Sequence, residues 1–231
     1  MGQGMKWRPT VFRDVSFRAA SRYAMTRYQD VNRILIVVMI LSMASIAPGA
    51  SASTAAATTI VSDLHEALIE SMKAGSEISY EERYEQLQPV IERTHHFPYI
   101  ARFVLGRYAS RLEREEQQQF LEVFRRLSVA TYASRFDNYN GERFQHVSSR
   151  EVSPGRMVVR TVLVTSKGTR VQLDYLLLRR DDRWAIVNVL ADGVSDLALR
   201  RSEYAWLLQN EGFMALLEEL HRQIDDLAQR S

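Results

Sequence analysis

The sequence predicts an α+β fold in which helices precede and follow one antiparallel sheet. Apolar residues recur at helical spacing over residues 59–136 and again from residue 194 to the end of the chain. Between them, over residues 142–190, apolar and polar residues alternate with a period of two. Because the strands form one block and do not alternate with helices, we expect a meander of about four antiparallel strands.

The helices before the sheet are defined by their apolar spacing and their end signals. We expect them over residues 59–72, 79–93, 99–112 and 113–136. Ser79 is followed three residues later by Glu82, which is the capping-box spacing. Pro89 should bend or split the second helix, and Gly106 should weaken the third.

The fourth helix is the clearest element of the sequence. Phe120, Phe124 and Leu127 follow one another at i, i+4 and i+7, and the opposite side carries charged residues. Such a wide apolar stripe must be buried against another layer. We expect this helix to close one face of the sheet.

The sheet region contains four runs of alternating residues separated by short turns. These runs cover residues 144–152, 156–165, 169–179 and 184–190. Pro154-Gly155 and Asp181-Asp182 are the turn signals at two of the connections. One face should carry Met157, Val159, Thr161, Leu163, Val171, Leu173, Tyr175 and Leu177. The same residues could line a filled core or a cavity beneath helices that stand away from the sheet, so both interpretations remain open here.

The C-terminal part is helical again, over residues 194–209 and from Phe213 onward. Asn210, Glu211 and Gly212 interrupt the pattern between the two helices. Leu216, Leu220 and later apolar residues keep helical spacing to the end of the chain.

The first 52 residues have the order of a secretory signal peptide. A basic stretch precedes fourteen uncharged positions, residues 34–47, and Pro48-Gly49 and Ala50-Ser51-Ala52 follow them. We expect cleavage after Ala52, a disordered segment over residues 53–60, and one functional domain over residues 61–231. The alternative is an uncleaved anchor in which residues 50–60 lengthen the apolar span.

Composition excludes several classes of function. The chain has 30 basic and 28 acidic residues, of which seven and two lie in the leader, so the remainder carries 23 basic and 26 acidic residues. A net charge of −3 and a secreted location argue against nucleic acid binding. The chain has no cysteine, so neither a thiol nucleophile nor a disulfide is available. We expect no cofactor and no bound metal.

Few residues suggest catalysis. His95-His96 is the only histidine cluster, and adjacent residues on a helix diverge by about 100°, which is unfavourable for sharing a metal. Asp137 and Asp192 lie near the ends of predicted elements, where acid–base residues occur but where ordinary turn formers are also found. The cluster Arg179-Arg180-Asp181-Asp182-Arg183 is best interpreted as a solvated hairpin tip. We therefore expect a protein that is not an enzyme.

Several short segments, in this order and spacing, resemble the MlaC / toluene-tolerance family of auxiliary components of ABC lipid-transport systems. They are Leu105-Gly106-Arg107-Tyr108, Phe124-Arg125-Arg126-Leu127, Thr131-Tyr132-Ala133-Ser134-Arg135-Phe136-Asp137, Tyr139-Asn140-Gly141-Glu142-Arg143-Phe144, Leu173-Asp174-Tyr175, Trp184-Ala185-Ile186-Val187 and Asp192-Gly193-Val194-Ser195. The run Ala198-Leu199-Arg200-Arg201-Ser202-Glu203-Tyr204 is most similar to the hopanoid-associated branch, HpnM.

The resemblance implies an NTF2-like sheet packed by helices around a hydrophobic pocket that takes the acyl chains of a phospholipid or a hopanoid-type lipid. It implies a periplasmic carrier that exchanges lipid with an inner-membrane MCE-domain/ABC transporter complex and an outer-membrane lipoprotein, in the maintenance of outer membrane asymmetry. The pocket-lining residues that we expect are Ile100, Phe103, Val104, Phe120, Phe124, Leu127, Tyr132, Val159, Leu163, Val171, Leu173, Tyr175 and Leu177. The remaining alternatives are an NTF2-like enzyme acting on an apolar substrate and an interaction module with a solid core.

Overall fold

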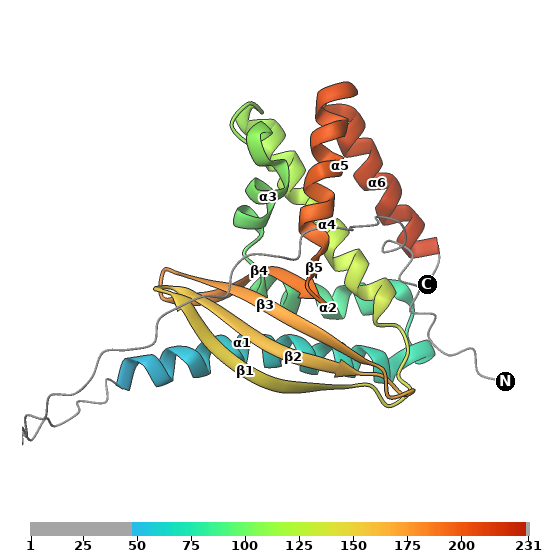
Figure 1. Ribbon diagram of the computed structural model, residues 1–231. Helices are drawn as coiled ribbons and strands as arrows, with labels where there is room; N and C mark the ends of the chain where they lie inside the picture. Colours follow the sequence, from blue (N-terminus) through green and yellow to red (C-terminus); the bar gives the residue numbers. More distant parts are fainter. Residues whose placement is uncertain (1–47, 230–231) are drawn as a thin grey trace, which may run out of the picture. The chain divides into compact units, whose positions relative to one another are not determined.

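The computed structural model describes residues 48–229, which form one compact unit (Figure 1). Its helices are α1 (Pro48–Ala74), α2 (Tyr80–Thr94), α3 (Phe97–Leu105), α4 (Arg114–Arg135), α5 (Asp196–Asn210) and α6 (Phe213–Gln229), with short 3-10 turns at Gly75–Glu77 and Gly106–Tyr108. Its strands are β1 (Arg143–Ser153), β2 (Arg156–Val164), β3 (Arg170–Arg180), β4 (Arg183–Ala191) and β5 (Val194–Ser195).

The strands form one antiparallel sheet in the order β1-β2-β3-β4-β5. The α+β prediction is confirmed, and the four predicted strands agree with β1 to β4 to within two residues at each end. The additional strand β5 contains only two residues. The β3–β4 hairpin turns at Asp181-Asp182, and both residues have positive φ angles, 48° and 60°, as a type I′ turn requires.

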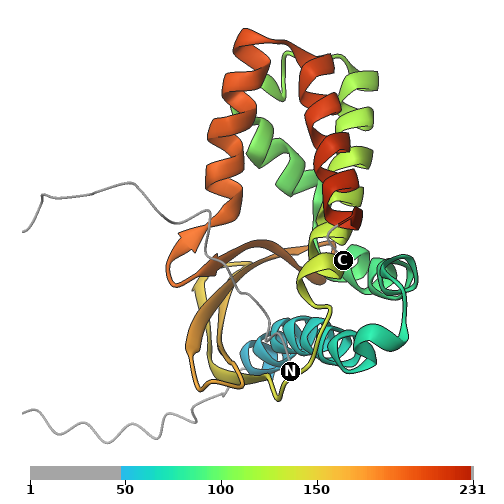
Figure 2. The same ribbon diagram turned by 90° about the vertical axis from the view of Figure 1, so that its right-hand side faces the viewer.

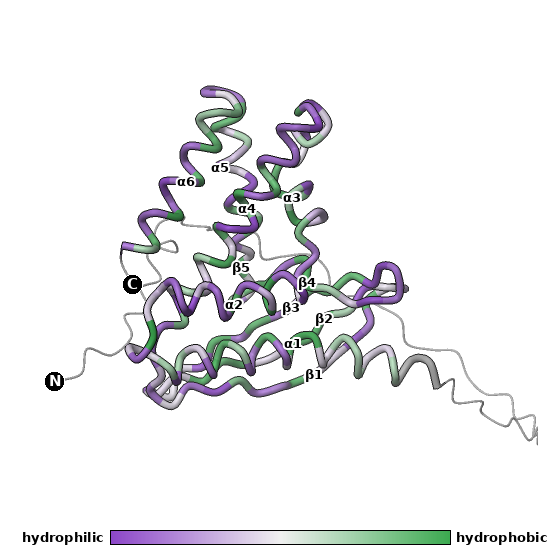
Figure 3. The backbone as a smooth tube through the Cα atoms, turned by 180° about the vertical axis from the view of Figure 1, so that it is seen from behind, coloured by the Kyte–Doolittle hydropathy of each residue, from purple (hydrophilic) through white to green (hydrophobic). Residues whose placement is uncertain are grey.

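Helices cover one face of the sheet, which we call the inner face. Figures 1 and 2 show α1 lying along this face, and Figure 3, seen from behind, shows α1 and α2 in front of the strands. Met157, Val159, Tyr175 and Leu177 point to the inner face and are at most 3% exposed. The alternate positions form the outer face, part of which α3 meets. Helices α3, α4, α5 and α6 rise from the β4 edge of the sheet.

The helix that closes the inner face is α1, and our expectation that the fourth helix does so is wrong. His65 of α1 forms a hydrogen bond with Tyr175 of β3 (2.9 Å) and stacks on Phe144 of β1 (3.8 Å between ring centroids). The apolar stripe of α4 packs instead against α6, α2 and α3. Both helices present suitable apolar faces, and periodicity does not specify which surface each face meets.

The N-terminal part of α1 differs from the sequence-based expectation. Residues 53–60, predicted to be disordered, are helical. Alanine has the highest intrinsic helix propensity, and Ala57 is fully buried. Thr58 also forms a hydrogen bond with Ser149 of β1 (2.7 Å), so tertiary contacts hold this small-residue segment in place. The predicted signal, residues 1–52, lies almost entirely outside the described residues.

Helices α2 and α3 differ from the prediction at Pro89 and at Gly106. Helix α2 continues through Pro89, whose exposed position allows water to satisfy the carbonyl that lacks an amide partner. Helix α3 ends at Leu105, seven residues earlier than the predicted end, because the next residue, Gly106, adopts a positive φ of 55°. Within residues 48–229, no helix combines the length and the apolar character that a membrane crossing needs.

Candidate functional site

The predicted pocket-lining residues are distributed over two connected parts of the interior. One part lies among the helices: Phe120 and Phe124 of α4 pack against Tyr204 of α5, with ring centroids 5.9 and 6.5 Å apart. Ile100 and Val104 of α3 are buried in the same cluster. This part has the dense aromatic packing of a core, and it joins α3, α4 and α5 into one group.

The other part lies between α1 and the inner face of the sheet. Val159, Tyr175 and Leu177 of the inner face are buried there, and Leu173 is partly buried beside them. Leu127 and Tyr132 of α4 and Phe103 of α3 belong to or pack against the same cluster. Leu163 and Val171 are buried as well, but they lie outside this cluster. The structure therefore brings eleven of the thirteen predicted residues into contact with one continuous core.

Two histidine–tyrosine pairs, one buried and one partly buried, interrupt this apolar interior. Besides the contact between His65 and Tyr175, Tyr132 contacts Nε2 of His95 at 3.3 Å. Nδ1 of His95 lies 3.0 Å from the carbonyl oxygen of Ile91, so this nitrogen carries the hydrogen and Nε2 accepts from the tyrosine. Each pair links two elements: α1 with β3, and the end of α2 with α4.

Burial controls the protonation of these pairs. It lowers the pKa of His65 to about 3 and the pKa of His95 to about 4, because a charged imidazole loses its hydration. For the same reason the pKa of Tyr132 rises to about 12, and the pKa of Tyr175 rises well above its usual value. All four groups are neutral at physiological pH. The interior therefore contains no fixed charge at these pairs and remains compatible with an apolar ligand.

A mostly apolar pocket of about 170 Å³ lies where α3 meets the outer face of the sheet. Tyr99 and Phe103 contribute from α3, and the wall opposite them is formed by residues of β1 to β4. That wall contains Val152, Arg156, Met157, Val158, Leu176, Leu177, Leu178, Val187 and Asn188. Ligand pockets usually enclose about 300–1,000 Å³. A larger apolar ligand therefore requires α3 to move away from the strands.

Of the predicted site residues, Phe103 and Leu177 line this pocket. The sequence analysis did not select Tyr99, Val158 or Leu176. A signal for the last two was present, because β2 and β3 carry apolar residues at alternate positions on both faces. A strand exposed on its outer face would normally be polar there.

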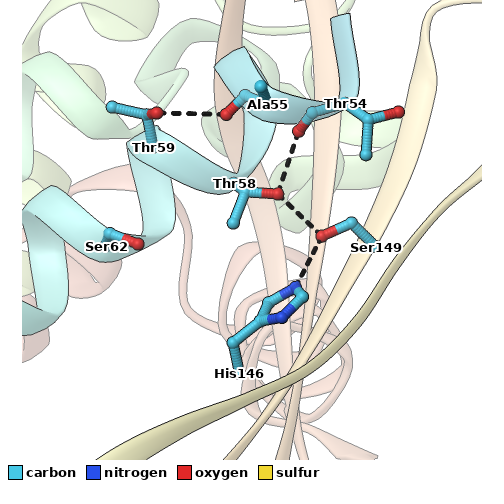
Figure 4. Close-up of a pocket in the computed structure, with 7 residues that line it drawn as sticks. All are labelled: Thr54, Ala55, Thr58, Thr59, Ser62, His146 and Ser149. Atoms are coloured by element: carbon cyan, nitrogen blue, oxygen red, sulfur yellow. Dashed lines mark hydrogen bonds between the residues drawn. The ribbon is translucent and has the colours of Figure 1, made fainter. Parts of the chain in front are cut away.

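A second depression, of about 830 Å³, is wide and open and lies between the start of α1 and β1. Figure 4 shows its lining residues, Thr54, Ala55, Thr58, Thr59, Ser62, His146 and Ser149. Thr58 donates to the carbonyl oxygen of Thr54 (2.9 Å) and contacts Ser149, which in turn lies 2.9 Å from Nε2 of His146.

The order of these hydrogen bonds decides what Ser149 can do. Thr58 has one hydroxyl hydrogen, which it gives to Thr54, so Ser149 must donate to Thr58 and accept from His146. An activated serine has the opposite arrangement, in which the hydroxyl donates to a bare imidazole nitrogen. Among the described residues, no carboxylate contacts the other ring nitrogen of His146. The groove is thus a hydrogen-bonding surface without the geometry of a nucleophilic site.

The other candidate chemical residues have structural positions. The imidazole of His96 accepts from the backbone N–H of Tyr99 (3.1 Å) and caps α3. The carboxylate of Asp192 accepts from the backbone N–H of Gln172 (2.9 Å) in a turn, and Asp137 follows the end of α4. No three His, Asp or Glu side chains gather as metal ligands in the described part of the chain. Asp181-Asp182 forms an exposed hairpin tip, as predicted.

Comparisons with known proteins agree with the arrangement of the fold. Over 128 residues, the chain is 23% identical to the intermembrane phospholipid transport system binding protein MlaC of Haemophilus influenzae. This match covers 54% of the chain and spans about 60% of the length of that relative. A solved phospholipid-binding protein from Ralstonia solanacearum, in complex with a phospholipid, has a TM-score of 0.65 at 20% identity.

The match to the Ralstonia structure covers 76% of this chain and 98% of that chain, which shows that the two proteins share a fold. The sequence model of one family, described as MlaC protein, matches residues 62–222. That range contains all the strands and most of the helical residues described above. The chain therefore belongs to the MlaC protein family.

Proposed function

We propose that this protein is a periplasmic lipid-binding carrier that shuttles a phospholipid between membranes as part of an ABC lipid-transport system. The observation that carries the proposal is the apolar pocket between α3 and the sheet, in a chain of the MlaC family. The names of the Haemophilus relative and the Ralstonia structure support phospholipid as the cargo. A hopanoid-type lipid remains the alternative cargo, on the resemblance of residues 198–204 to the HpnM branch.

The free energy of lipid transfer explains why such a pocket is useful. Each buried CH₂ group contributes about 0.8 kcal/mol, so one long acyl chain contributes on the order of 10 kcal/mol. A lipid that leaves a bilayer without a carrier loses this favourable free energy, because its acyl chains are exposed to water. A soluble protein that covers the chain with Phe103, Leu176 and neighbouring side chains retains most of it. Of the thirteen predicted pocket residues, Phe103 and Leu177 line this pocket, and the inner-face residues would contact acyl chains only after the space between α1 and the sheet opens.

The partners of the carrier follow from the same proposal. A carrier that picks up and releases lipid needs a donor and an acceptor at the two membranes. We propose an inner-membrane MCE-domain/ABC transporter complex and an outer-membrane lipoprotein for these roles. The signal peptide predicted over residues 1–52 would deliver the chain to the periplasm, where both partners are accessible.

The direct test is mass spectrometry of lipids extracted from the protein recovered from the periplasm. We expect about one phospholipid or hopanoid per chain, and the class of lipid distinguishes the two cargoes. Phe103→Asp should abolish this lipid because it places a carboxylate on the pocket wall. Met214→Asp makes a similar change at a side chain that is 64% exposed and should leave the lipid bound.

Circular dichroism must show that Phe103→Asp is folded, and Tyr99→Asp provides a second pocket variant. A wild-type protein that never carries lipid would overturn the carrier function. Folded pocket variants that retain lipid at the wild-type level would show that the cargo lies elsewhere.

A further inference from the structure

The outer face of the sheet is strongly basic. Strand register assigns each residue to a face, because directly paired residues of antiparallel strands point to the same side. Arg160 pairs with Asp174, Arg156 with Leu178, and Arg180 with Arg183, all on the outer face. The outer-face arginines are Arg143, Arg150, Arg156, Arg160, Arg170, Arg180 and Arg183.

Few acidic residues lie on this face, although Asp181 and Asp182 occupy the turn between Arg180 and Arg183. Asp174 is the one carboxylate at an outer-face position of β1 to β4, and Arg160 binds both of its oxygens (2.6 and 3.0 Å). Arg170 donates to the neutral amide of Gln145 (3.4 Å). The remaining five outer-face arginines form no ion pair with any described residue. The basic face is notable because the chain after the predicted cleavage site has three more acidic than basic residues.

Apolar side chains occupy the centre of the same face. Val158 and Val162 of β2 and Leu176 and Leu178 of β3 are half-buried there. Helix α3 covers part of this face, where Tyr99 and Phe103 lie over Val158, Leu176 and Leu178 at the pocket, whereas Val162 lies outside the pocket lining. An antiparallel face that a helix covers only in part is normally polar over the rest, so valines and leucines at its alternate positions are unusual.

An apolar centre surrounded by guanidinium groups matches the surface of an anionic bilayer. Guanidinium groups bind phosphate oxygens in pairs, and apolar side chains beside the α3 contact, such as Val162, can contact the first acyl carbons. An acidic protein surface would pair with the arginine charges but would leave the apolar side chains without a partner. We propose that the outer face docks on the surface of an anionic phospholipid bilayer. This inference goes beyond the carrier function and does not depend on lipid transfer.

The test is co-sedimentation with vesicles made from phosphatidylethanolamine and phosphatidylglycerol, using the protein recovered from the periplasm. Binding should be strong at low salt, weak at 1 M salt because the charges are screened, and absent on phosphatidylcholine vesicles. A basic residue near an anionic surface contributes roughly fivefold to partitioning, so Arg150→Gln with Arg183→Gln should weaken binding roughly 30-fold.

The matched control is Arg102→Gln with Arg114→Gln, which removes the same charge from exposed positions of α3 and α4. This control should bind vesicles like the wild-type protein, and equal melting temperatures will show that both variants are folded. Equal losses in the two double variants, or no wild-type binding to anionic vesicles, would overturn the proposal. Absence of wild-type binding to anionic vesicles would favour an acidic protein partner. Co-purified lipid is measured separately, so failure of docking does not affect the carrier test.

Discussion

At the scale of single residues, His65 and His95 are the polar groups whose environment the tertiary structure changes most. Each imidazole is buried, neutral and bound to a tyrosine hydroxyl. The pKa values of about 3 and about 4 lie below the usual 6.5, so the unfolded chain binds more protons than the folded chain below pH 6.5. The contribution of each histidine to stability is therefore complete above pH 6.5 and is lost as the pH falls toward the folded pKa.

We predict that acidification destabilises the protein partly through these two side chains. For one histidine with these pKa values, the free energy of unfolding should fall by roughly 2 kcal/mol between pH 7.5 and pH 5. His65→Phe should remove this share of the pH dependence, although the variant also leaves the Tyr175 hydroxyl without its partner. Urea unfolding at the two pH values measures the difference for each protein.

His146→Gln is the control for this prediction, because the His146 ring is exposed and contacts Ser149 at the surface. The histidine explanation fails if His65→Phe loses as much stability on acidification as the wild-type protein does. Carboxylates titrate in the same range, but their contribution is common to all three proteins and cancels in the comparison.

At the scale of elements, local sequence signals predict where the helices begin. The side chain of Ser79 accepts from the backbone N–H of Glu82 (3.1 Å), and the carboxylate of Glu82 accepts from the backbone N–H of Ser79 (2.8 Å). The predicted capping box is confirmed, and Glu113 with Glu116 forms a second one at α4. These contacts lie within four residues, so they do not depend on the rest of the fold.

Ser79→Ala should destabilise the protein by about 1 kcal/mol, because the backbone N–H of Glu82 at the start of α2 loses the Ser79 hydroxyl as its acceptor. The change is measured by urea unfolding at pH 7.5. Ser76→Ala, at an exposed serine in the preceding 3-10 turn, should change the free energy of unfolding by less than about 0.5 kcal/mol. Equal effects of the two substitutions would contradict the capping role.

At the scale of the whole described unit, the helical group of α3, α4, α5 and α6 meets the sheet mainly along β4 (Figures 1 and 2). The N-terminal end of α3 is attached to this strand by the backbone N–H of His96, which donates to the carbonyl oxygen of Ile186 (2.9 Å). Its C-terminal end stops at Gly106. Helix α3 thus covers the pocket of 170 Å³ between two defined ends.

We predict that α3 moves when lipid enters or leaves. Amide hydrogens of residues 97–112 should exchange faster in the lipid-free protein than in the lipid-loaded protein, because an acyl chain would fill the space beneath Tyr99 and Phe103. Hydrogen–deuterium exchange measures this difference, with α6 as the internal reference. Equal protection of residues 97–112 in both forms would rule out this opening.

The sequence by itself determined the class of fold, the four main strands and the starts of the capped helices, because these features depend on period and on contacts between near neighbours. It also predicted the inner-face residues, since alternation along β2 and β3 does not require knowledge of the partner layer. Tertiary structure decided that α1 covers the sheet in place of α4, and that residues 53–60 are helical. Only the folded chain placed the pocket beneath α3 and brought seven arginines onto the same outer face, because packing between distant elements depends on complementary surfaces that a one-dimensional pattern does not specify.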